Sequence, residues 1–95
     1  MSAAADLDVV AIVQPEQGLA TDELLAQFID DAATTLPALR GYRTSAEVIT
    51  DSTQLDLEEQ IAALETIANN AEKLLKANGY RINWDHGGYV IYRGA

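Results

Sequence analysis

Residues 54–78 constrain the fold more than any other stretch, because their apolar side chains recur alternately every four and three positions. That spacing places the apolar residues on one side of an α-helix and the polar residues on the other. The apolar stripe comprises Leu57, Ile61, Leu64, Ala68, Ala71 and Leu75. The sequence therefore predicts a long amphipathic helix, which must bury this stripe against the rest of the chain or against a second copy.

The two ends of this helix carry recognisable signals. We expect Thr53 to cap the first turn, with the acidic Asp56 three residues later, where the helix dipole favours negative charge. Asp51 and Ser52 offer alternative caps, so the first helical residue stays open. Gly79 suits the left-handed conformation that commonly follows the end of a helix.

A second amphipathic helix is predicted over residues 21–36. Thr21 is the expected N-cap, and Asp22 and Glu23 follow in the first turn. The apolar positions are Leu24, Leu25, Phe28, Ile29, Ala32 and Leu36. Pro37 ends or kinks this helix, and residues 37–40 can add a single turn before Gly41.

After Gly79 the period of the sequence changes to two, which predicts a β-hairpin over residues 80–93. Residues 85–88 supply the turn, either as a two-residue turn at His86 and Gly87 or as a four-residue loop. Both alternatives pair Trp84 with Tyr89 and Ile82 with Ile91. The opposite face of the hairpin carries Arg81, Asn83, Val90 and Tyr92.

An isolated hairpin is marginal in water, so the apolar run at residues 9–13 is predicted to be a third strand, with an extended arm that docks on a neighbouring molecule as the alternative. Residues 44–50 sustain neither period, and we predict a short strand there, with a helical turn as the alternative. Residues 1–8 are small and polar and are expected to form a mobile arm. Together these elements predict a single α+β domain over residues 9–95, built from two main helices and the hairpin.

Composition narrows the classes of function that are open to this chain. The chain of 95 residues has no cysteine, so it forms no disulfide or thiolate metal site. No segment approaches membrane-spanning length and no signal peptide is evident, which predicts a cytoplasmic protein that does not enter the membrane. The net charge of −9 disfavours direct binding to nucleic acid.

No residue pattern indicates catalysis, a metal or a cofactor. His86 is the single histidine, and its position between Asp85 and Gly87 is typical of a turn. The acidic pairs at 30–31 and 58–59 are adjacent in sequence and diverge by about 100° on a helix, so neither makes a chelating face. We therefore predict a protein that is not an enzyme.

A helix followed by a hairpin resembles the recognition helix and wing of winged-helix DNA-binding domains, and Arg81, Tyr92 and Arg93 would then be wing residues. The resemblance implies that helix 54–78 enters a DNA groove. That helix is acidic along its length, at Asp56, Glu58, Glu59, Glu65 and Glu72. A recognition helix needs Lys or Arg to meet phosphates, so this function is the least favoured alternative.

The function favoured by the sequence is a small acidic protein–protein interaction module, acting as an accessory, inhibitor or assembly factor and able to self-associate into a homo-oligomer. The predicted partner-binding residues are Arg81, Val90, Tyr92 and Arg93, since Tyr and Arg are enriched where interfaces carry binding energy.

An acidic face is the second candidate surface. Residues 1–39 contain seven acids and no Lys or Arg. The predicted face comprises Asp22, Glu23, Asp30 and Asp31, and an ordinary solvated helix face is its simpler interpretation. The alternative function is a decoy, of the kind carried by mobile elements, that mimics nucleic acid and occupies a basic groove of another protein.

Overall fold

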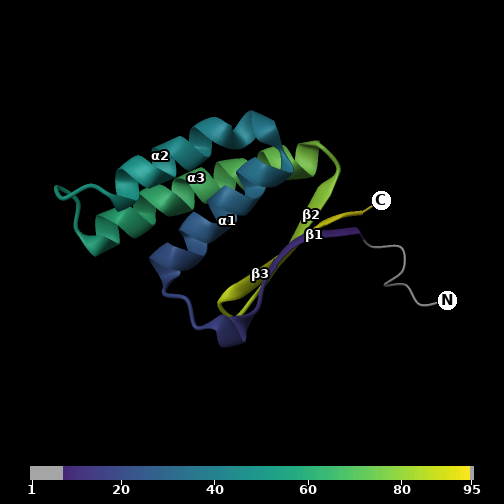
Figure 1. Ribbon diagram of the computed structural model, residues 1–95, viewed down its shortest axis with the longest axis horizontal. Helices are drawn as coiled ribbons and strands as arrows, with labels where there is room; N and C mark the ends of the chain where they lie inside the picture. Colours follow the sequence, from purple (N-terminus) through teal and green to yellow (C-terminus); the bar gives the residue numbers. More distant parts are fainter. Residues whose placement is uncertain (1–7, 95) are drawn as a thin grey trace.

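A computed structural model describes residues 8–94, in which helices cover one face of a three-stranded antiparallel sheet (Figure 1). The strands are β1 (Asp8–Val13), β2 (Tyr80–Asp85) and β3 (Gly88–Arg93), and the helices are α1 (Thr21–Thr35), α2 (Arg40–Thr50) and α3 (Leu57–Ala77). Two short 3-10 helices, η2 (Pro15–Gln17) and η3 (Pro37–Leu39), precede α1 and α2. The predicted α+β class is confirmed.

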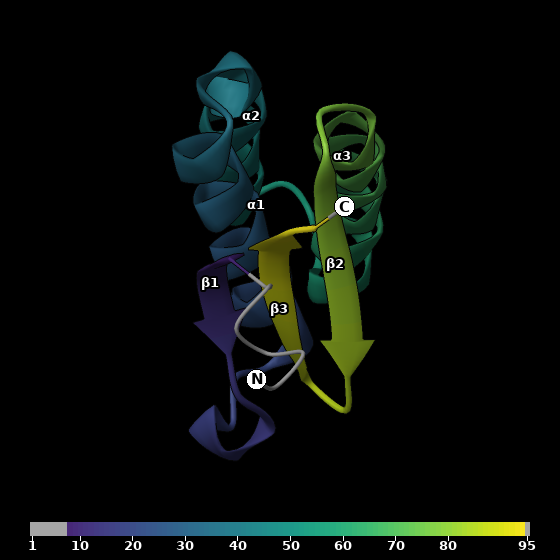
Figure 2. The same cartoon turned by 90° about the vertical axis from the view of Figure 1, so that its right-hand side faces the viewer.

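The sheet has the strand order β1-β3-β2, so the C-terminal strand lies between the hairpin's first strand and the N-terminal strand (Figure 2). Trp84 pairs with Tyr89 and Ile82 with Ile91, as predicted. His86 and Gly87 form the two-residue turn, with φ angles of 28° and 86°, values that suit the tight turns of hairpins. The third strand is confirmed and includes Asp8, whereas the rest of the predicted arm, residues 1–7, lies outside the described residues.

The core forms where α1 and α3 lie against the sheet and α2 packs against both helices. Its largest fully buried side chains are Phe28, Ile29, Leu39, Leu64, Leu75, Tyr89 and Ile91. The predicted stripe of α3 is buried at four positions and Ile61 is partly buried, but Leu57 at its N-terminal end is 57% exposed. The chain therefore covers most of this stripe by itself and needs no second copy to do so.

The strand predicted at residues 44–50 is wrong, because α2 occupies this stretch. Leu39 and Ala46 are buried and Tyr42 and Ile49 are partly buried, so the inward positions are spaced three, four and three apart, as in a helix. The β-branched residues that suggested a strand sit in helical turns, where the hydroxyl of Thr50 donates to the carbonyl oxygen of Ala46 at 3.0 Å.

Both predicted N-caps are also wrong. α3 begins three residues later than expected, and its cap is Asp56, whose Oδ1 accepts a hydrogen bond from the backbone N–H of Glu59 at 2.9 Å. The Glu59 carboxylate accepts from the backbone N–H of Asp56 at 3.3 Å in return. In α1 the N-cap position is held by Ala20, whose side chain accepts no hydrogen bond, and Thr21 is the first helical residue. Gly79 has a φ of 91°, as predicted for the residue after α3.

Candidate protein-binding surface

The sheet has one face that no helix in residues 8–94 covers (Figure 2). The strand register places two rows of side chains on it. Val9, Tyr92 and Arg81 form one row across the three strands. Ile12, Val90 and Asn83 form the second row. The intervening rows contain Ile91 and Tyr89, which are buried beneath the helices, so successive residues of β2 and β3 point to opposite sides. In β1 a β-bulge shifts the register between Val9 and Ala11.

This open face is largely apolar. Val9 is 53% exposed and Ile12 is 50% exposed, while Val90 and Tyr92 are partly buried. A hollow of about 110 Å³ lies at one end of the face, beside Val90 and Asn83. Exposed aliphatic side chains next to a tyrosine and an arginine are the composition expected of a protein-binding surface.

Three of the four predicted partner-binding residues, Arg81, Val90 and Tyr92, share this face. Arg93 does not, because the register pairs it with Tyr80 in a row on the other side of the sheet. Its Nη2 donates a hydrogen bond to the Tyr80 hydroxyl at 2.6 Å, and its guanidinium lies 5.1 Å from the centre of the Tyr80 ring. The hydrogen bond to Tyr80 raises the pKa of Arg93, so this residue is a fixed cation away from the open face.

A groove of about 450 Å³ runs along the outer edge of β1. Residues 10–13 form one wall, Gln27 and Asp31 of α1 form the other, and Gln17 and Leu19 lie at its end. Because β1 is an edge strand, one side of its backbone is not paired within the sheet. The groove therefore joins an open strand edge to a helix wall that carries a carboxylate.

The carboxylate of Asp31 is held in place from two sides. The Tyr89 hydroxyl donates a hydrogen bond to Oδ2, and Nε2 of Gln27 donates to Oδ1 at 3.0 Å. Burial raises the pKa of Tyr89, and the hydrogen bond to Asp31 raises it further. The phenol thus stays neutral and orients the carboxylate at the groove wall.

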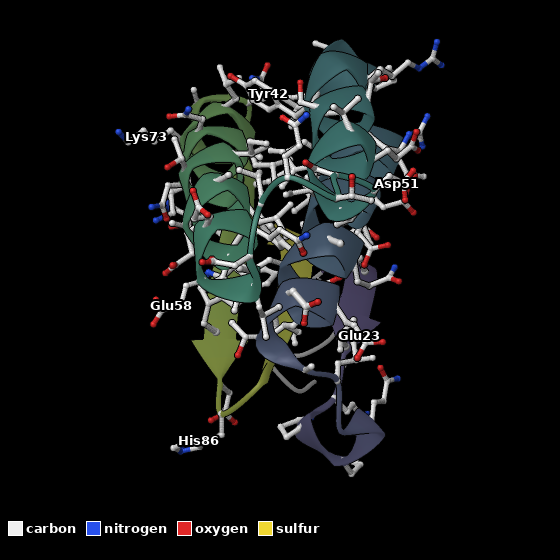
Figure 3. The ribbon with its side chains drawn as sticks, turned by 90° about the vertical axis from the view of Figure 1, so that its left-hand side faces the viewer. Glu23, Tyr42, Asp51, Glu58, Lys73 and His86 are labelled. Atoms are coloured by element: carbon white, nitrogen blue, oxygen red, sulfur yellow. The ribbon has the colours of Figure 1, made fainter. Side chains whose placement is uncertain are left out.

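The four predicted acidic residues do not form one continuous face. Asp30 pairs with Arg43 of α2 at 3.3 Å, whereas Asp31 turns towards the sheet. Glu23 accepts a hydrogen bond from the Ala20 N–H at 3.3 Å and projects outward near the start of α1 (Figure 3). Asp22 is partly buried. Adjacent acids on a helix diverge by about 100°, which explains why Asp30 and Asp31 have different neighbours.

The positive residues gather at one end of the molecule. Arg40 and Arg43 lie in the first turn of α2, Lys73 and Lys76 in the last turns of α3, and these helix ends lie together (Figure 1). Arg81 and Arg93 lie at the ends of β2 and β3 that adjoin α3.

The groove beside β1 is negative, because Asp31 is the one charged side chain among the described residues that line it.

Other features of the chain offer little chemistry. Across residues 8–94, no three His, Cys, Asp or Glu side chains are grouped so that they could hold a metal ion. His86 lies at the hairpin tip, 94% exposed, with Nε2 3.6 Å from Oδ1 of Asp85 (Figure 3). In the same described range, no helix is both long enough and apolar enough to cross a membrane.

The sequence did not indicate that Val9 and Ile12 join the hairpin's outer face, nor that a groove borders β1. Both depend on the pairing of β1 with β3, residues separated by about eighty positions, and a short apolar run carries no signal for that register. Comparisons with protein-family models, curated proteins and solved structures return no match, so the site is interpreted from its own geometry.

Proposed function

We propose that this protein is a small, acidic, non-enzymatic protein–protein interaction module that binds another protein through the open face of its sheet. The observation that carries the proposal is the pair of rows across that face, with exposed Val9 and Ile12 beside Tyr92 and Arg81. Such a protein acts as an accessory, inhibitor or assembly factor, according to which surface of the partner protein it covers.

Buried residues on the other side of the sheet hold the open face rigid, and this rigidity favours binding. Tyr89 and Ile91 of β3 are almost fully buried under α1 and α3, and the Tyr89 ring packs edge-on against Phe28 at a centroid distance of 5.2 Å. The outward side chains of β3 therefore stand on a rigid strand. A rigid surface loses little conformational entropy when a partner binds.

Photo-crosslinking in cells tests the proposal. A photoreactive amino acid at Asn83, which is exposed between the apolar residues, should capture a defined protein partner, whereas the same group at Thr66 on the exposed side of α3 should not. In purified form, Arg81→Ala and Tyr92→Ala should each weaken binding of that partner about tenfold or more. Lys73→Ala removes an exposed cation elsewhere and is the matched control. Equal binding by all three variants would refute the open face as the binding site.

Self-association through the same face is one form of this proposal. Light scattering across a salt series gives the mass in solution. An oligomer held by the apolar rows should persist at high salt and dissociate in Tyr92→Ala, because apolar contacts are not screened. A monomer at every salt concentration would rule out self-association, and binding to a different protein would be the remaining form of the proposal.

The nucleic-acid mimic remains the alternative function. It is favoured less, since Asp30 is paired with Arg43 and Asp31 is hydrogen-bonded to Tyr89, which leaves no row of free carboxylates on α1. Salt separates the two: binding by a mimic should fall steeply as ionic strength rises, whereas binding by the apolar face should not. A winged-helix function is favoured least, because α3 lays its buried side against α1 and the sheet and exposes Glu58, Glu59 and Glu65.

A further inference from the structure

We propose that the free edge of β1 takes an extended, basic segment of the partner protein as a fourth strand of the sheet. This inference rests on the proposed function and specifies how the partner binds. It follows from the backbone of β1, the groove beside it and the charge of the groove, each of which is independent of the two rows on the open face.

The backbone of Ile12 is directed towards the groove. A Cβ added at Gly88 would collide with the carbonyl oxygen of Val13, so that carbonyl points towards β3. Carbonyl and N–H groups of successive residues in a strand point to opposite sides, and those of Ile12 therefore point to the free edge. Unpaired groups of this kind are a template for another strand.

β1 has one β-bulge, where its register against β3 shifts between Val9 and Ala11, and it pairs regularly over residues 11–13. Its sequence, Asp8–Val13, contains no Lys and no Pro, the residues that commonly block strand addition, and both Val10 and Ile12 are exposed. The groove of about 450 Å³ provides room beside the edge. Side chains of an added strand would alternate between the groove, under Gln27 and Asp31, and the open face, beside Ile12.

The charge of the groove indicates a basic segment. Asp31 carries the single charge among the described lining residues. A bound segment that carries a Lys or Arg can therefore place a cation beside this carboxylate.

A second copy of this chain fits the edge poorly. In an antiparallel pairing of two β1 strands about a twofold axis, both α1 helices would lie on the same side of the joined sheet. Each would bring its Asp31 to the seam, and the like charges would repel in a groove that contains no cation among its described residues. The occupant is thus a segment of a different, basic protein.

A displayed library of random eight-residue peptides, selected against the full chain at low salt, tests the inference. The enriched peptides should alternate apolar with polar residues and carry a Lys or Arg. When such a peptide is added, hydrogen exchange of the Ile12 amide should slow at least tenfold, while that of the Thr66 amide within α3 should not change. The preference for a cation should be lost when Asp31→Asn is used for selection.

Two variants at Ile12 test whether its outward N–H is needed for peptide binding. Ile12→Pro removes the outward N–H at an edge position where proline is tolerated, and it should abolish peptide binding, whereas Ile12→Val keeps the N–H and should bind normally. Circular dichroism checks that both variants are folded. If Ile12→Pro disrupts the fold, the Asp31→Asn selection and the Ile12 exchange decide the matter.

Other outcomes overturn strand addition while leaving the proposed function to its own crosslinking test. Peptides that bind Ile12→Pro as well as the unaltered chain, but lose affinity for Tyr92→Ala, would place the whole binding site on the open face. A library that yields no binder, or binders without cations, would refute the basic segment. A second copy at the edge would appear as a dimer that Ile12→Pro dissociates.

Discussion

The phenolic hydroxyl of Tyr89 donates a hydrogen bond to the carboxylate of Asp31 and so joins the central strand of the sheet to α1. Tyr89 is 1% exposed, and its ring contacts Phe28 of α1. The carboxylate that makes the groove negative is therefore positioned by the core. A change at Asp31 affects both the helix–sheet contact and the charge of the candidate site.

This contact predicts a loss of stability in alkali. Burial and the hydrogen bond to Asp31 raise the pKa of Tyr89 in the folded state above its ordinary value of 10.0. The stabilisation is fully present below pH 10 and is lost as the pH rises above it, because the unfolded chain then releases a proton that the folded chain retains. The free energy of unfolding should fall by up to about 1.4 kcal/mol per pH unit.

Urea unfolding of the unaltered chain and of Tyr89→Phe at pH 8 to 11 measures this effect. The variant lacks the titrating group, so its stability should fall less steeply above pH 10. Tyr42→Phe, which removes a hydroxyl from α2, is the control and should keep the steep fall. Identical slopes for Tyr89→Phe and the unaltered chain would contradict the assignment.

Leu64 and Leu57 give a matched pair in α3, since both belong to the predicted stripe but only Leu64 is fully buried. Leu64→Ala should lower the free energy of unfolding by about 2–5 kcal/mol, because it removes core contacts and leaves a cavity. Leu57→Ala should change it by less than about 0.5 kcal/mol. Thermal melting followed by circular dichroism measures both, and similar losses would show that the N-terminal end of α3 is buried after all.

The start of α3 gives a second matched pair. Asp56→Ala should destabilise the domain by about 1 kcal/mol, because it removes the acceptor for the Glu59 N–H at the helix N-terminus. Thr53→Ala should have little effect, since Thr53 lies outside α3. Urea unfolding curves of the two variants compare these positions directly. A larger loss of stability for Thr53→Ala than for Asp56→Ala would show that Thr53 caps α3, as the sequence suggested.

Sequence patterning predicted the long elements well, because their periodicity extends over several turns or pairs. The α3 stripe and the hairpin register around Trp84 and Ile82 are local patterns that need no knowledge of the tertiary fold. α2 was missed because β-branched residues such as Val48 and Ile49 favour strands locally. Its helical spacing becomes visible only when Leu39, which precedes Gly41, and Tyr42, which directly follows it, are counted with Ala46.

The candidate site was predictable only in part. Arg81, Val90 and Tyr92 share a face because alternation within one hairpin places them there. Val9 and Ile12 join them through the pairing of the first strand with the last, which a sequence of apolar residues on both faces leaves undetermined. The groove needs in addition the position of α1 beside β1, and no local pattern encodes that distance.

Glu72 predicts a spectroscopic change in acid, because its Oε1 accepts a hydrogen bond from Nε1 of Trp84, the single tryptophan, at 2.8 Å. Partial burial alone would raise the pKa of Glu72, but the hydrogen bonds from Lys76 and Trp84 outweigh it and lower the pKa below 4.5. The interaction therefore stabilises the fold above pH 4.5 and is lost as the pH falls through the lower folded value.

Tryptophan fluorescence from pH 7 to 2 follows this titration. The emission of Trp84 should change with a midpoint below pH 4.5, as the carboxylate that holds the indole N–H becomes protonated. Glu72→Gln should remove the change, whereas Glu65→Gln, at an exposed position of the same helix, should preserve it. If Glu72→Gln titrates like the unaltered chain, another group governs the indole, and the contact between α3 and β2 does not depend on this carboxylate.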